Sequence, residues 1–160
     1  MAEVRMSGGE ALLHIGANGS EVTCNGASDD VRVVRIALGY AGVPATLFRG
    51  DIPTALELEN AIAVVEDEVM PAARQLAGVT ALVTAGAELR AFATAPPGDD
   101  DGIVALEHVE QLFDELSRVA LGGPVSHLPF ALTKKSAATL VILRELMHHA
   151  GVRTLRCVDR

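Results

Sequence analysis

The sequence predicts a single α/β domain over residues 1–160, built on a mixed five-stranded sheet. Three observations lead to this fold class. Near the N-terminus, three apolar and β-branched runs are separated only by short turns, which is typical of an antiparallel meander. Later segments carry apolar residues at helical spacing. Short apolar runs alternate with those segments, as in α/β units. The predicted order of elements is therefore βββαβααβ.

The first two predicted strands flank a turn of small residues. The run from Ala11 to Ile15 is followed by residues 16–19, G-A-N-G, and a second strand starts near Glu21. Glycine and asparagine tolerate positive φ, so we expect the backbone to fold back sharply at this turn. Such a turn can present several N–H groups to an anion, particularly a phosphate. An ordinary hairpin is the simpler interpretation of these residues taken alone.

The third strand is predicted within residues 31–42, after a turn at residues 27–30, and residues 45–48 are predicted to add a short edge strand. A helix then begins at Thr54, because Thr54 and Glu57 have the spacing of a capping box. Pro71 lies within this helical pattern and should kink or break the helix.

The second half of the chain offers another candidate anion site. A buried strand at residues 80–83 leads through a small-residue turn into a short helix, whose N-terminus would favour negative charge. Glu88 weakens this site, because its carboxylate would lie in the first turn. The remaining predicted elements are a loop at 96–102, an amphipathic helix over 106–119, a helix capped by Thr133 that starts with Lys134 and Lys135, and a closing strand at 152–158.

Two groups of potential metal ligands lie in the predicted helices. One is Glu66-Asp67-Glu68 and the other is His148-His149. Successive helical residues diverge by about 100°, so neither group by itself predicts a metal site. The acidic group is better explained as a solvated face, and the histidines as partners of the helix dipole.

Composition excludes several classes of function. A net charge of −8 argues against nucleic-acid binding, which needs clustered Lys and Arg. The sequence has no apolar run long enough for a membrane span, and the N-terminus lacks the apolar core of a secretory signal. Cys24 and Cys157 have no C-x-x-C spacing and indicate neither a zinc site nor a disulfide framework. The default location is the cytoplasm.

The element order is that of a ribonuclease-H-like domain, the repeated half of the actin, Hsp70 and hexokinase superfamily. Within it, the chain resembles the second domain of the exopolyphosphatase and guanosine-pentaphosphate phosphatase family. That family's loop D-I-G-G-G-S-T-E aligns without gaps with residues 14–21, H-I-G-A-N-G-S-E. Its L-G-A-V-R-L segment is similar to residues 36–41 and its G-x-G-G-T-x-R loop to residues 84–90. Its A-L-G-x-x-x-L-R-V-S-D-R ending is similar to the final helix followed by residues 152–160.

The resemblance implies a phosphate site formed by two loops. It assigns to that site Gly16, Ala17, Asn18, Gly19, Ser20, Glu21, Gly86, Ala87, Glu88 and Arg90. It also implies a possible Mg²⁺ cofactor. Three departures bear on these roles. His14 replaces the family's Asp and is a poor partner for Mg²⁺, which prefers oxygen ligands. Glu88 replaces a Thr, and Ala17 with Asn18 replaces two glycines.

The sequence therefore favours a stand-alone domain that binds a phosphate-bearing small molecule or polyphosphate, without the family's first domain and its catalytic glutamate. One alternative is a phosphohydrolase that becomes active when a homodimer or a first-domain-like subunit completes the cleft. The other is a protein-interaction domain without a ligand. An exposed apolar face would mark its interface.

Overall fold

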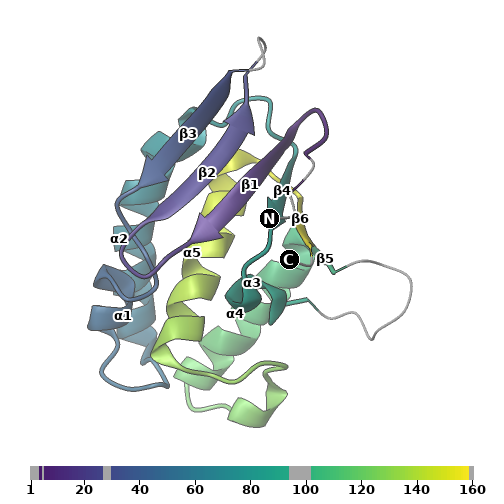
Figure 1. Cartoon of the computed structure of the whole chain (residues 1–160). Helices are drawn as coiled ribbons and strands as arrows, with labels where there is room; N and C mark the ends of the chain where they lie inside the picture. The colour runs from purple at the N-terminus through teal and green to yellow at the C-terminus, as the bar shows by residue number, and fades with distance from the viewer. Residues whose placement is uncertain (1–3, 5, 27–29, 94–101, 159–160) are drawn as a thin grey trace.

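The computed structural model describes residues 4, 6–26, 30–93 and 102–158. Its described part consists of one twisted sheet with helices packed behind it (Figure 1). The strands are β1 (Glu10–Ile15), β2 (Ser20–Asn25), β3 (Val31–Ile36), β4 (Ala81–Thr84), β5 (Ile103–Ala105) and β6 (Thr154–Cys157). The helices are α1 (Val43–Leu47), α2 (Ala55–Arg74), α3 (Ala87–Arg90), α4 (Leu106–Ala120), the 3₁₀ turn η1 (Val125–His127) and α5 (Lys134–Ala150).

The antiparallel meander is confirmed. β1 pairs with β2 and β2 with β3, both antiparallel, while β1 pairs in parallel with β4 and β4 with β6. The strand order is β3-β2-β1-β4-β6-β5. Residues 27–29 and 96–101, to which the sequence assigned a turn and most of a loop, lie outside the described residues.

The sheet has a sixth strand that the sequence analysis missed. β5 pairs antiparallel with β6 at the sheet edge, where Ile103 lies opposite Arg156. With only three residues and Ile103 exposed, the segment has too little alternation to be distinguished from the start of α4. Its strand conformation is stabilised by pairing with β6, which sequence pattern alone does not reveal.

One local prediction was wrong, and of the kink or break predicted at Pro71 the break does not occur. Residues 45–48 form most of helix α1 and its C-cap instead of an edge strand, because Pro44 occupies the first turn, where its missing N–H costs no hydrogen bond. Helix α2 begins at the predicted capping box but is not broken at Pro71, since it continues to Arg74. Ala72, Ala73 and Leu76 are buried, so core packing favours the extra turn over the local preference of proline.

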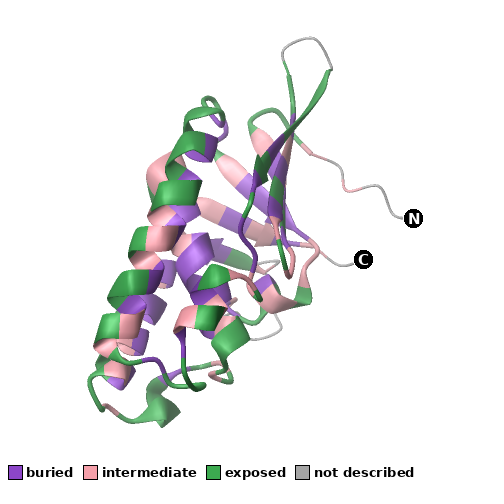
Figure 2. Ribbon diagram, turned by 90° about the vertical axis from the view of Figure 1, so that its left-hand side faces the viewer, coloured by how far each residue is buried: buried purple, intermediate pink, exposed green. Residues whose placement is uncertain are grey.

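All the long helices cover the same face of the sheet. Helix α5 packs between α2 and α4, and nearly every residue from Ala137 to Met147 is buried. Figure 2 shows this helical layer on one side and, in the described part of the chain, no helix covering the opposite face. We call that opposite face the open face. Among the described helices, none is both long and apolar enough to span a bilayer.

Candidate phosphate-binding site

The β1–β2 turn is closed by a backbone hydrogen bond, in which Gly16 N–H donates to the Gly19 carbonyl at 2.9 Å. The expectation of left-handed glycines here was wrong, because neither Gly16 nor Gly19 has a positive φ. Close packing explains the glycine at position 16 instead. A Cβ atom on Gly16 would lie 2.9 Å from the Gly19 carbonyl oxygen.

The segment that follows β3 clamps this turn. Tyr40 N–H donates to the Gly16 carbonyl at 3.0 Å, and Ala41 N–H donates to the Ala17 carbonyl at 2.9 Å. Gly39 makes this approach possible, since a Cβ there would lie 2.2 Å from the Gly16 carbonyl oxygen. No such Cβ contact occurs in folded proteins, so only glycine fits at position 39 without moving the backbone.

Ser20 is buried directly under the turn and has a structural contact. Its side chain is 1% exposed and its Oγ donates to the Leu38 carbonyl at 2.7 Å. The hydroxyl therefore connects β2 to the clamping segment. In this geometry it faces the protein interior and not the surface of the turn.

Three backbone donors of the turn have no protein acceptor in the described part of the chain. Within the described residues, the backbone N–H groups of Ala17, Asn18 and Gly19 donate no hydrogen bond to a protein atom. Asn18 is exposed at the tip. Consecutive free N–H groups on a tightly held turn are the kind of backbone feature that binds anions.

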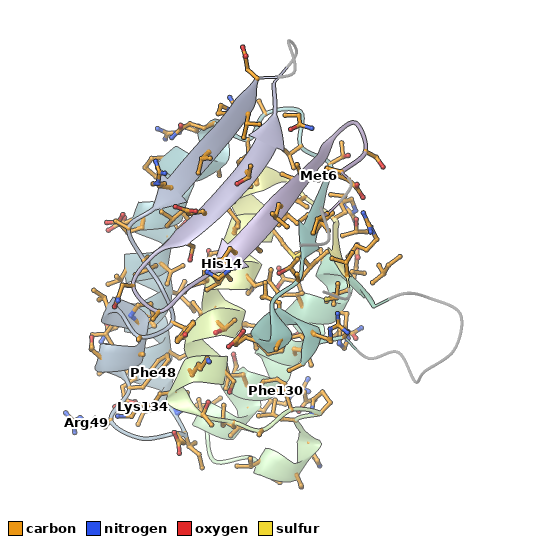
Figure 3. The ribbon with its side chains drawn as sticks, viewed as in Figure 1. Met6, His14, Phe48, Arg49, Phe130 and Lys134 are labelled. Atoms are coloured by element: carbon orange, nitrogen blue, oxygen red, sulfur yellow. The ribbon has the colours of Figure 1, made fainter. Side chains whose placement is uncertain are left out.

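Beside the turn, the open face carries a shallow depression of about 530 Å³. It is lined by His14, Gly19, Ser20, Glu21, Arg35, Ile36 and Ala37. His14, at the end of β1, is exposed on this face (Figure 3). Glu21 lies opposite Arg35 in the β2–β3 register, and its Oε1 accepts a hydrogen bond from Arg35 Nε at 3.1 Å.

The second predicted loop lies close to the first. Gly86 N–H donates to Thr84 Oγ1 at 3.0 Å, which fixes the turn before α3. Glu88 then accepts a hydrogen bond from Lys135 Nζ at 2.7 Å. This hydrogen bond holds the pKa of Glu88 below its usual range, and the electrostatic influence of His14 also lowers the Glu88 pKa. Because β1 and β4 are neighbouring parallel strands, the turns at their C-terminal ends lie at the same edge of the sheet.

Lys135 joins three elements at this position. Its Nζ contacts Glu88, lies 4.3 Å from the centre of the Tyr40 ring, and projects from the first turn of α5. The hydrogen bond to Glu88 raises the pKa of Lys135, so the ammonium stays charged well above neutral pH. Tyr40 was not predicted as a site residue, because its role depends on a contact between residues far apart in sequence.

The resemblance placed Arg90 at the phosphate site in the second loop. The hydrogen bond described for its side chain lies outside that site. Its Nη2 donates to the Val158 carbonyl at 2.5 Å, so it interacts with the chain just after β6. Ala87 is exposed at the start of α3. The structure thus brings the β1–β2 turn, Gly86 and Glu88 together, and directs Arg90 toward the end of β6.

The residues at this site do not fit a bound Mg²⁺. Mg²⁺ needs oxygen ligands in nearly octahedral geometry. The two carboxylates nearest the turn each pair with a basic side chain, Glu21 with Arg35 and Glu88 with Lys135. The position of the family's Asp is taken by His14, whose nitrogen ligands suit other metals better. We therefore derive no role for Mg²⁺ here.

Comparison with known proteins agrees with the fold. No protein-family profile and no characterised protein sequence matches the chain significantly. A solved Ppx/GppA family member from Aquifex aeolicus has a TM-score of 0.70 and 17% identity, and the match covers 94% of this chain and 52% of that one. The fold is that of one half of a Ppx/GppA structure.

Two further solved structures agree. The type II variant of the Aquifex aeolicus Ppx/GppA phosphatase has a TM-score of 0.73 at 17% identity, with 98% of this chain and 55% of that chain covered. An exopolyphosphatase-like protein has a TM-score of 0.68 at 11% identity, with 94% and 55% covered. This chain spans about half the length of each. At such identities the likeness concerns the fold, and the predicted resemblance is confirmed at that level.

Proposed function

We propose that this exopolyphosphatase-like domain binds a phosphate-bearing ligand at the β1–β2 turn without hydrolysing it on its own. The observation that carries the proposal is the set of free N–H groups on Ala17, Asn18 and Gly19. The clamp from Tyr40 and Ala41 fixes their direction before any ligand arrives, which lowers the entropic cost of binding. The Glu88–Lys135 pair places an ammonium beside the ring of Tyr40, a residue of the clamp.

The side chains around the turn argue against catalysis by these residues alone. Phosphoryl transfer requires a positioned nucleophile and stabilisation of the charge that develops on the transferred group. Here the hydroxyl of Ser20 is directed at Leu38, and Glu21 and Glu88 are each held by a basic partner. A homodimer, or a subunit resembling the first domain of the family, could supply the missing groups. Such a complex would be a phosphohydrolase that acts on polyphosphate or guanosine polyphosphates.

Calorimetric titration tests the binding proposal. Tag-free protein is titrated with tripolyphosphate, long-chain polyphosphate and guanosine tetraphosphate, with and without Mg²⁺. We expect binding with a dissociation constant of about 10 μM or lower for at least one of them. Asn18→Asp places a negative charge at the turn and should weaken binding at least about tenfold, equivalent to roughly 1.4 kcal/mol.

The matched control is Asn25→Asp, which makes the same change at an exposed position at the far end of β2. Its affinity should equal that of the wild type. The proposal is overturned if no ligand produces heat, or if both aspartate variants bind as the wild type does. Phosphate release, measured in the same samples, separates hydrolysis from binding.

A second candidate function, a protein-interaction domain, rests on the open face. Val31 is 67% exposed, Val33 37% and Ile103 48%, although all three are β-branched strand residues of the kind usually packed against a second layer. We propose that a second copy of this chain covers this face. Light scattering should then report a dimer for the wild type and a monomer for Val33→Lys. A monomeric wild type over the micromolar range contradicts it.

Location in the cytoplasm is part of the proposal. Cys24 and Cys157 are both buried and unpaired. Unpaired cysteines are typical of a reducing compartment, where disulfides do not persist. The proposed ligands, polyphosphate and guanosine polyphosphates, would be met there.

A further inference from the structure

A second group of polar side chains lies in the helical layer, far from the β1–β2 turn in sequence. Helices α2 and α5 run side by side in the same direction (Figure 1). Glu145 and His149 are four residues apart and therefore share one face of α5. Glu66 of α2 meets them there. His149 Nε2 lies 3.3 Å from Glu66 Oε1 and 3.2 Å from Glu145 Oε2.

This group is buried on one side and open on the other. The side chain of Glu145 is 6% exposed, that of His149 22%, and that of Glu66 43%. The arrangement places one carboxylate in the interior and leaves a path from solvent beside Glu66. A cation could enter by that path, and water could occupy a remaining coordination position.

The surrounding charges leave a deficit of positive charge. Arg144 Nη1 donates to Glu145 Oε1 at 2.9 Å, and Arg144 Nε donates to Glu110 Oε2 at 2.9 Å. One guanidinium therefore contacts two of the three carboxylates, Glu110 and Glu145, and the described contacts give Glu66 no Lys or Arg partner. His148 points to Glu110, with its Nδ1 3.9 Å from Oε1, and not to the other two carboxylates. Carboxylates brought together at a partly buried position strongly favour a cation.

The distances suit a particular kind of cation. Zinc binds imidazole nitrogen and carboxylate oxygen at about 2.0–2.2 Å in tetrahedral geometry, which separates neighbouring ligand atoms by about 3.3 Å. The two distances from His149 Nε2 already have this value. The three ligand atoms all lie within 4.8 Å of one another. Mg²⁺ is disfavoured, because it seldom takes a nitrogen ligand.

We propose that Glu66, Glu145 and His149 form a zinc site that joins α2 to α5. Arg144 acts as an outer-shell partner, because it holds Oε1 of Glu145 and so directs Oε2 toward the site. A bound ion would link helices whose mutual packing forms much of the layer behind the sheet. The site is independent of the phosphate-binding proposal.

Zinc titration of tag-free protein tests this site, with calorimetry for affinity and Co²⁺ absorption for coordination geometry. We expect one equivalent bound and tetrahedral Co²⁺ bands. Glu66→Gln and His149→Gln should each weaken binding at least about tenfold, since even outer-shell changes have effects of that size. His148→Gln is the matched control, because it removes the neighbouring imidazole of the same helix, and it should bind zinc as the wild type does.

Glu66→Gln should fold like the wild type, because Glu66 is the most exposed of the three side chains. This variant therefore tests zinc binding even if a substitution at a more buried ligand prevents folding. Zinc should also raise the melting temperature of the wild type and of His148→Gln, but not that of Glu66→Gln. The proposal is overturned if the wild type binds no zinc at millimolar concentration, if both ligand variants keep wild-type affinity, or if His148→Gln loses as much as His149→Gln. In those cases the direct contacts of His149 with the two carboxylates explain the cluster.

Discussion

Charged side chains gather in two regions, around the β1–β2 turn and between the C-terminal halves of α2 and α5. The two regions balance their charges differently. Around the β1–β2 turn each described carboxylate has its own basic partner, as in Glu21 with Arg35 and Glu88 with Lys135. Between α2 and α5, Glu66 and Glu145 share the imidazole of His149, and Arg144 is divided between Glu145 and Glu110. The first region offers backbone donors to an anion, whereas the second has room for a cation. The family-like motif marks only the first.

Steric crowding at Gly39 is the tightest constraint on the β1–β2 turn. A substitution there should therefore lower the free energy of unfolding more than the other substitutions below. Gly39→Ala would place a Cβ 2.2 Å from the Gly16 carbonyl oxygen and 2.5 Å from backbone atoms of Ala17. We expect the free energy of unfolding to fall by about 3 kcal/mol, as in strongly overpacked sites. Urea denaturation measures this. Gly50→Ala is the control, because nothing lies within 4 Å of its added Cβ. Equal losses in the two variants would refute the clamp.

Ser20→Ala distinguishes a structural hydroxyl from one that binds a ligand. Removing Oγ leaves the Leu38 carbonyl without its partner in a buried position, which should cost about 1–2 kcal/mol of stability. Phosphate affinity should stay at the wild-type value. Ser126→Ala, at an exposed position of η1, should change neither quantity. A tenfold loss of phosphate affinity with unchanged stability would place Ser20 in direct contact with the ligand.

The Glu88–Lys135 pair predicts a pH dependence with a definite sign. The pKa of Glu88 is lowered by the hydrogen bond from Lys135, so the pair's contribution to stability is present at neutral pH and disappears as the pH falls through that lowered pKa. Because the pKa of Lys135 is raised, the ion pair persists to a higher pH than it would with an ordinary lysine. In Lys135→Gln, an NMR titration should find the pKa of Glu88 returned toward its ordinary value. An unchanged pKa would contradict the contact.

The exposed Glu21–Arg35 pair should have the smallest effect. The side chain of Arg35 is 74% exposed and that of Glu21 is 47% exposed. Arg35→Gln should therefore change the free energy of unfolding by less than about 0.5 kcal/mol, which is typical of ion pairs at the surface. Thermal and urea denaturation both report it. A loss above 1 kcal/mol would mean that the charges at the turn contribute more than simple pairing does.

Much of the fold could be predicted because its signals are local. The caps at Thr54 and Thr133 set the starts of α2 and α5, and β-branched runs joined by short turns give the meander. The error at residues 45–48 overlooked the local signal of Pro44 in the first turn of α1, but two other errors occurred where distant residues decide the outcome. β5 depends on pairing with β6, and the continuation of α2 past Pro71 depends on core packing.

The candidate sites differ in the same way. The loop motif located the β1–β2 turn, but it could not reveal that the Ser20 hydroxyl faces Leu38, since that contact spans 18 residues. The cluster of Glu66, Glu145 and His149 could not be found from the sequence of either helix alone, because its residues come from both α2 and α5. Within one helix, neighbouring ligands diverge. Across two packed helices, residues 79 or more positions apart converge on one point.

The most direct test of the central claim is an NMR titration of ¹⁵N-labelled protein with tripolyphosphate, following the backbone amides of Ala17, Asn18 and Gly19. We predict that these three signals shift with a single saturable binding curve, while the amide of Asn25, at the other end of β2, does not move. If the ligand leaves the three amides unchanged, or shifts other regions only, the β1–β2 turn is not a phosphate site.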